Sequence, residues 1–150
     1  MIKTASLRAV FDTNVIIAAL KSKNPHSPNA ELLTRWRERE FSLLYADDLL
    51  LEYREKFITR NIEFALQISF LANLDALGER IELSPHQIQP RVPADPDDDV
   101  VIACALAGQA THLVTYDPHL LNLGERYEGI ALVDGLRFLY AVRGDTLFKE

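Results

Sequence analysis

The sequence predicts an α/β fold of three layers, in which a central, mostly parallel sheet lies between helices. Short apolar segments alternate with longer amphipathic segments along the chain, as expected for strands joined by helices. No internal repeat, low-complexity segment or linker interrupts this alternation. The chain has 150 residues, of which 48% are hydrophobic and 25% charged, so we expect one domain over residues 1–150.

The first half of the chain supplies two expected strands, each followed by helices. A buried strand over 7–11 leads through Asp12-Thr13-Asn14 into a helix over 15–20, because Asp, Thr and Asn side chains cap helix starts. Apolar residues cover much of the circumference of a later helix over 62–77, which we therefore expect to be largely buried or to form a subunit contact. The other expected elements are a helix over 30–40, a strand over 41–45, and a helix that begins at Asp47 or Asp48 and ends near Arg60.

The second half contains a proline-rich segment between two strand–helix units. A short strand is expected over 81–83, and four prolines make 84–98 irregular. Acidic residues are favourable at a helix start, and Asp97-Asp98-Asp99 precedes an expected helix over 100–107 that Gly108 closes. The remaining expected elements are a strand over 112–115, a short helix to Leu123, a strand over 130–133 and a helix over 135–142.

Charge and cysteine content exclude some classes of protein and disfavour others. The net charge of −6 disfavours a passive nucleic-acid-binding module, but less so a nuclease whose bound cations neutralise the substrate locally. Cys104 is the single cysteine, which excludes an internal disulfide and a cysteine metal cluster, and we expect it to be a small buried hydrophobe. No apolar run reaches the roughly 20 residues of a membrane span. Residues Met1 to Thr4 lack signal-peptide features, so we expect a cytoplasmic protein.

Four acidic residues are candidates for a shared site. Asp12 and Asp117 each follow an expected strand, and ligands of open α/β sheets bind beyond the carboxyl ends of the strands. Asp99 lies at a helix start that points to the same edge. Glu52 is a charged residue in an otherwise apolar stretch and therefore needs a structural or functional reason.

Gathered carboxylates repel one another unless they share protons or hold cations, and Mg²⁺ and Mn²⁺ prefer oxygen ligands. Such ions activate water and stabilise charge on a phosphodiester. Each acid alone also has an ordinary explanation: Asp12 and Asp97 to Asp99 as a helix start, Glu52 as a solvated helix residue, and Asp117 as a turn residue. Spacing alone therefore predicts only an α/β enzyme or regulator with an acidic edge.

These residues resemble a known family, the PIN-domain nucleases. The opening strand with its Asp12-Thr13-Asn14 signature is similar to the family's first block, and Glu52 stands where the family carries its second acid. The acids at 97–99 before an alanine-rich stretch resemble the third block, and segment 113–117 resembles a strand that ends in Thr-x-Asp. Segment 130–139 resembles the family's closing strand and helix. The four blocks occur in the family's order and span nearly the whole chain.

The resemblance implies a metal-dependent ribonuclease. The acids that would hold Mg²⁺ or Mn²⁺ are Asp12, Glu52, Asp99 and Asp117, with Asp98 as the second choice for the third position. A metal-bound water would then attack an RNA phosphodiester, leaving a 5′-phosphate and a 3′-hydroxyl. Asn14 and Thr115 would support the ligands, because polar neighbours orient the groups that bind a metal.

Among the subgroups, the chain looks most like the VapC-type toxins of bacterial toxin–antitoxin modules, which implies an antitoxin partner and a homodimer. The chain departs from the family pattern after the fourth acid, where Pro118 and His119 replace an expected polar or acidic residue. His119 either adds to the site or caps the following short helix, and the cap is the favoured interpretation. Candidate RNA contacts, each also explained by a solvated charged face, are Arg35, Arg37, Arg39, Arg54, Lys56 and Arg60.

Two other classes of function stay open. A non-catalytic PIN fold would act as an interaction module. A phosphate-handling α/β domain, such as a phosphatase or signalling receiver, would use Asp12 as a phosphorylated nucleophile. A haloacid-type phosphatase would want a second Asp where this chain has Asn14, and the late strand-end lysine of a receiver is not evident.

Overall fold

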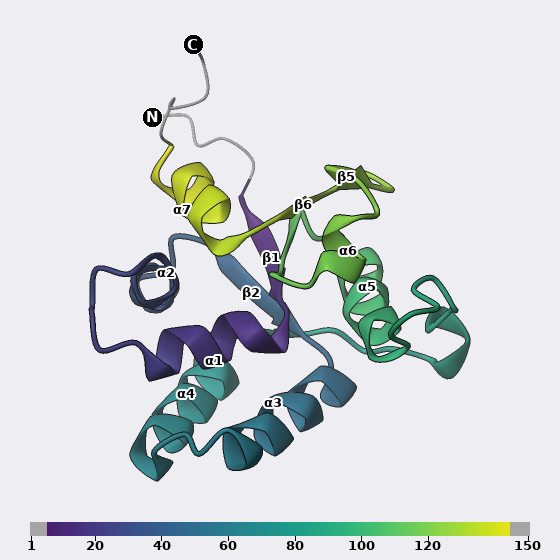
Figure 1. Ribbon diagram of the computed structural model, residues 1–150. Helices are drawn as coiled ribbons and strands as arrows, with labels where there is room; N and C mark the ends of the chain where they lie inside the picture. Colours follow the sequence, from purple (N-terminus) through teal and green to yellow (C-terminus); the bar gives the residue numbers. More distant parts are fainter. Residues whose placement is uncertain (1–5, 145–150) are drawn as a thin grey trace.

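The computed structural model describes residues 6–144 and has a six-stranded sheet with strand order β3-β2-β1-β4-β6-β5. Helices lie on both sides of this sheet (Figure 1), as the three-layer prediction requires. Residues Met1 to Thr4, on which the signal-peptide argument rests, lie outside the described residues. The strands are β1 (Arg8–Phe11), β2 (Ser42–Tyr45), β3 (Glu79–Arg80), β4 (His112–Val114), β5 (Arg126–Tyr127) and β6 (Ile130–Val133).

The centre of the sheet is parallel, and its strands share one register. In β1, Val10 lies opposite Leu44 of β2 on one side and Leu113 of β4 on the other. β4 pairs in parallel with β6, and β2 pairs in parallel with β3, whereas β5 runs antiparallel to β6 at the far edge. Short apolar strands of this kind are typical of parallel sheets that are covered on both faces. The carboxyl ends of β1, β2, β4 and β6 therefore meet at one edge.

The helices divide between the two faces and this carboxyl edge. On one face α1, α2 and α7 pack against one another, while α5 covers β1, β2 and β4 from the other face (Figure 1). α3 contacts both α1 and α5 and so spans the carboxyl edge. The helices are α1 (Thr13–Lys21), α2 (Pro28–Arg37), α3 (Asp47–Thr59), α4 (Phe64–Leu77), α5 (Asp97–Ala107), α6 (Pro118–Leu121) and α7 (Gly135–Arg143), with a 3₁₀ turn at Pro85–Gln87.

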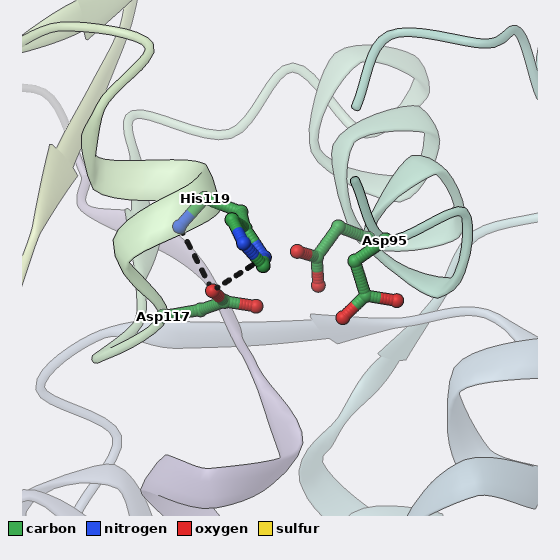
Figure 2. A group of neighbouring side chains, drawn as sticks. Asp95, Asp117 and His119 are labelled. Carbon is green, nitrogen blue, oxygen red and sulfur yellow. Dashed lines mark hydrogen bonds and ion pairs between the residues drawn. The ribbon is translucent and has the colours of Figure 1, made fainter. Parts of the chain in front are cut away.

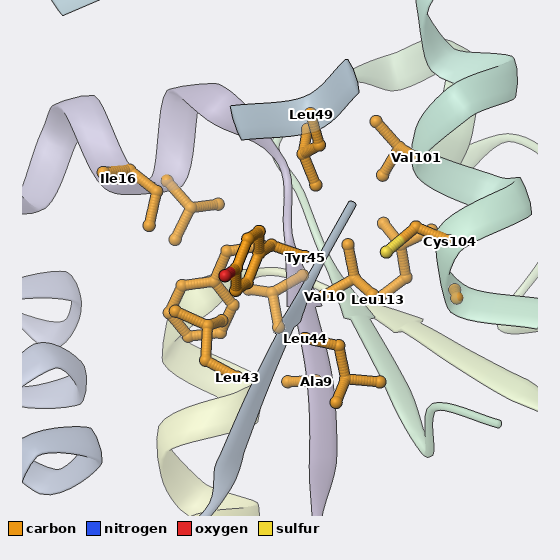
Figure 3. Close-up of a cluster of buried hydrophobic side chains, with 14 of the residues drawn as sticks. Ala9, Val10, Ile16, Leu43, Leu44, Tyr45, Leu49, Val101, Cys104 and Leu113 are labelled. Atoms are coloured by element: carbon orange, nitrogen blue, oxygen red, sulfur yellow. The ribbon is translucent and has the colours of Figure 1, made fainter. Parts of the chain in front are cut away.

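The hydrophobic core has one layer on each side of the sheet. Ile16 of α1 packs on one side, and Val101 and Cys104 of α5 pack on the other (Figure 3). Cys104 is fully buried, as the sequence analysis expected. Close packing on both faces leaves the strands little freedom to shift, so residues at the strand ends are held in fixed positions.

The structure differs from the sequence predictions at several element boundaries. α2 begins at Pro28 because proline suits the first position of a helix, and α5 begins at Asp97 and therefore includes all three acids. β3 lies at 79–80 rather than 81–83, and β5 was not predicted. These two strands have only two residues each, too few for a hydrophobic pattern to show.

The longest helix, α4, is mostly exposed. The sequence analysis expected this helix to be largely buried or to form a subunit contact. Within α4 only Phe70 and Leu74 are buried, whereas Phe64 and Ile68 are exposed. The prediction that this helix is largely buried was wrong, and the alternative, a subunit contact, stays a prediction. Within the described part of the chain, no helix combines the length and apolar composition that a membrane crossing requires.

Candidate metal centre

Two neighbouring strands deliver the first and fourth predicted acids to the same edge. Asp12 follows β1, and its backbone N–H donates to the carbonyl oxygen of Val114 in β4 at 2.9 Å. Asp117 lies three residues beyond Val114. Each acid also caps the helix that follows it: Asp12 accepts from Thr13 N at 2.9 Å, and Asp117 accepts from His119 N at 2.9 Å. The helix-cap interpretation and the shared edge are therefore both correct for these residues.

Asp12 is buried, and both of its carboxylate oxygens are hydrogen-bonded. Oδ1 accepts from Thr13 N, and Oδ2 accepts from the Thr115 hydroxyl at 2.8 Å. The Thr115 oxygen in turn accepts from Asp117 N at 2.9 Å. Thr115 is itself fully buried, so it joins the two acids through one rigid hydroxyl. This geometry agrees with the supporting role expected for Thr115.

Glu52 joins the same network from α3. The Thr13 hydroxyl donates to Glu52 Oε2 at 2.5 Å, while the Thr13 N–H contacts Asp12. The next residue, Tyr53, is fully buried, and its hydroxyl donates to the Phe11 carbonyl oxygen at 2.5 Å. Two successive residues of α3 are thus tied to the end of β1, which explains why a charged residue stands in this apolar stretch.

A second group of donors faces this network from α5 and α6. Side-chain atoms of Asp95, Asp98, Asp117 and His119 that are able to bind a metal all lie within 4.8 Å of one another. Asp117 and His119 stand at the start of α6, and Asp95 stands opposite them, before α5 (Figure 2). His119 Nδ1 lies 3.4 Å from Asp117 Oδ1.

Asp98 is the member of this group whose ionised form is least favourable. Only 4% of the residue is exposed, and its Oδ2 accepts no hydrogen bond from any donor among residues 6–144. Burial first, then contact with the Asp117 carboxyl and the charges of Asp12 and Asp95, raise the pKa of Asp98 well above its ordinary value of 3.8. Facing carboxylates of this kind share a proton or hold a cation.

Asp99, the predicted third ligand, lies elsewhere. Its Oδ1 accepts from the backbone N–H groups of Arg91 at 2.9 Å and Val92 at 2.8 Å, so it fastens the proline-rich segment to the start of α5. It does not belong to the group that gathers around Asp117. Successive residues of a helix point about 100° apart, so only one of these two acids can face the edge. Asp98, the second choice, occupies the place expected for Asp99.

The first and second acids also titrate in a shared field. Burial raises the pKa of Asp12, the bonds from Thr115 and Thr13 lower it, and the Asp117 charge raises it further. Burial likewise raises the pKa of the half-buried Glu52, against the bond from Thr13. The charge of Asp12 also raises the pKa of Glu52, so the first acid influences the second.

Sequence reasoning identified most of these residues but missed two. Thr13 bridges the first two acids, and its position inside the Asp-Thr-Asn signature was the available signal. Asp95 joins the group from the proline-rich segment, where no pattern marked it. Asn14, expected as a support, is exposed in the first turn of α1. His119 both faces the group and contacts the cap residue, so its two interpretations are compatible.

The donor set suits an oxygen-loving divalent cation. Carboxylates from β1, α3, α5 and α6 converge, and an unpaired buried oxygen at Asp98 would be satisfied by a positive charge. A separate cleft of about 760 Å³, lined partly by Leu121, Arg126 and Arg137, contains none of the predicted acids. The predicted acids therefore gather at the acidic edge and not in that cleft.

Comparisons with known proteins identify the family and the fold of this chain. A family model described as PIN domain matches residues 8–119. PAE2754 from Pyrobaculum aerophilum superposes with a TM-score of 0.63 at 15% identity, covering 93% of this chain and 91% of that one. A structure of VapBC2 from Rickettsia felis, bound to a DNA fragment from the promoter, superposes with a TM-score of 0.58 at 14% identity. The match covers 84% of this chain and 97% of that one. No curated protein matches the sequence.

Proposed function

Because this chain belongs to the PIN-domain family, we propose that it is a metal-dependent ribonuclease that hydrolyses RNA phosphodiester bonds. The observation that carries the proposal is the convergence of Asp12, Glu52, Asp98 and Asp117 at one edge of a parallel sheet. A structural protein has no evident need for several carboxylates that raise one another's pKa, because buried charge without a counter-charge is unfavourable.

The proposed ligands are Asp12, Glu52, Asp98 and Asp117, with Asp98 taking the position first expected for Asp99. Bound Mg²⁺ or Mn²⁺ would activate water and neutralise charge on the scissile phosphate. The residues of the chain hold the geometry: Thr115 fixes Asp12 relative to Asp117, and Thr13 fixes Glu52. Groups whose supports are buried and hydrogen-bonded stay in position without reorganising.

The basic residues that the sequence offered as RNA contacts differ in their availability. Arg35 contacts Glu31 at 2.8 Å and Glu40 at 2.6 Å, so its charge is already paired. Lys56 is exposed on α3, and its charge lowers the pKa of Glu52, one helical turn before it. We therefore propose Lys56 as a contact that holds the RNA backbone beside the acids.

We also propose that the protein is the toxin of a toxin–antitoxin pair and acts as a homodimer. The fold is similar to VapBC2, and α4 exposes Phe64, Leu66 and Ile68 on a surface that a partner would cover. Sedimentation of the pure protein tests whether it is a dimer.

Phe64→Ser together with Ile68→Ser should produce monomers if α4 forms the contact, and an unchanged dimer would place the interface elsewhere. RNA as substrate agrees with the cytoplasmic location expected from the sequence.

The decisive test compares wild-type protein with Asp12→Asn on a panel of single-stranded RNAs, with Mn²⁺, Mg²⁺ or EDTA. We expect metal-dependent cleavage to 5′-phosphate ends in wild type and its loss in the variant. Asp75→Asn, which changes an exposed acid of α4, serves as the matched control and should cleave normally. Metal binding without cleavage of any RNA by wild type would favour the non-catalytic interaction module.

The phosphate-handling alternative has no specific support. A haloacid-type phosphatase would need a second Asp two residues after Asp12, and that position holds Asn14, which is exposed in the first turn of α1. An acylphosphate at Asp12, detected by mass spectrometry, would revive this alternative.

A further inference from the structure

We propose that His119 and Asp95 complete, with Asp98 and Asp117, a mixed nitrogen–oxygen site that selects Mn²⁺ over Mg²⁺. The inference rests on the proposed metal-dependent function, and it adds two residues to the predicted acids. These four side chains come from the segment before α5, the first turn of α5 and the start of α6. Their ligand atoms lie within 4.8 Å of one another, a spacing that one ion can bridge after small side-chain rotations.

The buried Asp98 oxygen indicates that this cluster is built for a ligand. A polar atom that is buried without a partner is destabilising, and Oδ2 of Asp98 has none among residues 6–144. Carboxylate oxygens of Asp95 and Asp117 lie within 4.8 Å of an oxygen of Asp98, and carboxylates cannot donate while they are ionised. A cation would satisfy Asp98 and at the same time remove the repulsion between Asp98 and Asp117.

The other members of the cluster are held so that they face this position. Asp95 Oδ1 accepts from Asp97 N at 3.2 Å, and Asp117 Oδ1 accepts from His119 N at 2.9 Å. The imidazole of His119 lies beside Asp117, with Nδ1 at 3.4 Å from Oδ1 (Figure 2). A ring held against a carboxylate has a restricted orientation, as is common for histidines that bind metals.

The nitrogen donor is what determines selectivity. Mg²⁺ prefers oxygen ligands and retains several waters, so an imidazole contributes little to its binding. First-row transition ions accept imidazole nitrogen readily, and Mn²⁺ also accepts carboxylates. A site of three carboxylates and one histidine therefore gains more affinity for Mn²⁺ than for Mg²⁺, whereas an all-carboxylate site would discriminate less.

The test measures metal binding directly and without RNA. Wild type, His119→Ala and His119→Asp are titrated with Mn²⁺ by electron paramagnetic resonance of the free ion, with and without competing Mg²⁺. We expect His119→Ala to weaken Mn²⁺ binding by about 10- to 100-fold while Mg²⁺ binding changes less than about threefold. His119→Asp creates an all-oxygen site and should bind Mg²⁺ at least as tightly as wild type does.

The controls separate this inference from the proposed function. His26→Ala removes an exposed histidine outside the cluster and should leave both affinities unchanged. Asp95→Asn should lower the affinity for both Mn²⁺ and Mg²⁺. The inference would be overturned if each His119 variant lost affinity for Mn²⁺ and Mg²⁺ equally. It would also be overturned if neither variant lost affinity for either ion, even if RNA is cleaved. Selective loss of Mn²⁺ in a protein that cleaves no RNA would support the metal site and contradict the nuclease.

Thermal unfolding shows whether the His119 variants are folded and measures Mn²⁺ binding a second way. His119 is half exposed, with 50% of its side chain accessible, so its replacement should leave the fold intact. Mn²⁺ should raise the unfolding temperature of wild type more than that of His119→Ala, because a ligand of the native state stabilises it in proportion to its affinity. The same increase in both proteins would contradict the role of His119.

Discussion

The two sides of the acidic edge satisfy their carboxylates in different ways. On the side of Asp12 and Glu52, threonine hydroxyls and a backbone N–H donate to the acids. On the side of Asp98 and Asp117, carboxylates face each other and one buried oxygen has no donor among residues 6–144. The protein itself therefore completes the first side, whereas the second side depends on a proton or a cation. The comparison separates proposed ligands that the protein orients with threonine and backbone donors from proposed ligands whose carboxylates face one another.

The sharpest way to break this comparison is to replace each of two neighbouring acids. Asp99→Ala leaves the N–H groups of Arg91 and Val92 without their acceptor, which should lower the free energy of unfolding by about 2–4 kcal/mol. Asp98→Asn replaces a buried carboxyl that faces other carboxylates and should leave stability equal or higher in metal-free protein. Urea unfolding in EDTA measures both, and a larger loss in Asp98→Asn would contradict the assignment of roles.

Metal binding should reverse the order of these two variants. We expect Asp98→Asn to lose Mn²⁺ affinity by at least about 100-fold, because it removes a proposed ligand, while Asp99→Ala should lose far less. Calorimetric titration at a temperature where both variants are folded provides the measurement. If Asp99→Ala lost more affinity than Asp98→Asn, the original choice of Asp99 as the ligand would be restored.

The next effect tests the side that the protein completes. Thr115→Val keeps the shape of the side chain but removes the hydroxyl that joins Asp12 to Asp117 N. We expect metal affinity or RNA cleavage to fall about 10- to 100-fold, as for other residues that orient ligands. Thr34→Val, an exposed threonine of α2, is the matched control. An unchanged variant at position 115 would show that Asp12 needs no support from β4.

A pH titration distinguishes the two sides by a smaller effect. Burial raises the pKa of Asp98 above its ordinary value of 3.8, so the folded state binds this proton more tightly than the unfolded state. This contribution to stability is complete below about pH 4 and is lost as the pH rises, by at most about 1.4 kcal/mol per pH unit for one proton. Metal-free wild type should therefore lose more stability than Asp98→Asn as the pH rises from about 5 to about 8. Parallel curves for the two proteins would refute the prediction.

The smallest effect concerns RNA binding outside the acids. Lys56→Ala should weaken RNA binding a few-fold and reduce the slope of log affinity against log salt by about one, as loss of one phosphate contact does. Lys23→Ala, an exposed lysine in the loop before α2, is the control. Filter binding of RNA measures both effects, with each lysine substitution placed in a protein that also carries Asp12→Asn to prevent cleavage. Equal effects of the two substitutions would mean that Lys56 contributes only to the overall field.

Much of this arrangement was predictable from the sequence because the central strands are apolar and are followed directly by polar residues. Strand–helix alternation predicted the three layers, and Asp12 and Asp117 were placed at the correct edge. The choice between Asp98 and Asp99 was not predictable, since a helix start at 97 rather than 100 sets which of them faces the edge. The approach of Asp95 depends on how the proline-rich segment packs, and no local pattern encodes that.

The pairing of β1 with β4 joins residues that are far apart in the chain: Thr115 and Asp12 are separated by 103 positions. During synthesis, Asp12 and Glu52 emerge from the ribosome long before Asp98, Asp117 and His119. Because β4 pairs between β1 and β6, the acids cannot converge until the last third of the chain has emerged and inserted. The acidic edge is therefore assembled late in synthesis, long after its first two members have emerged.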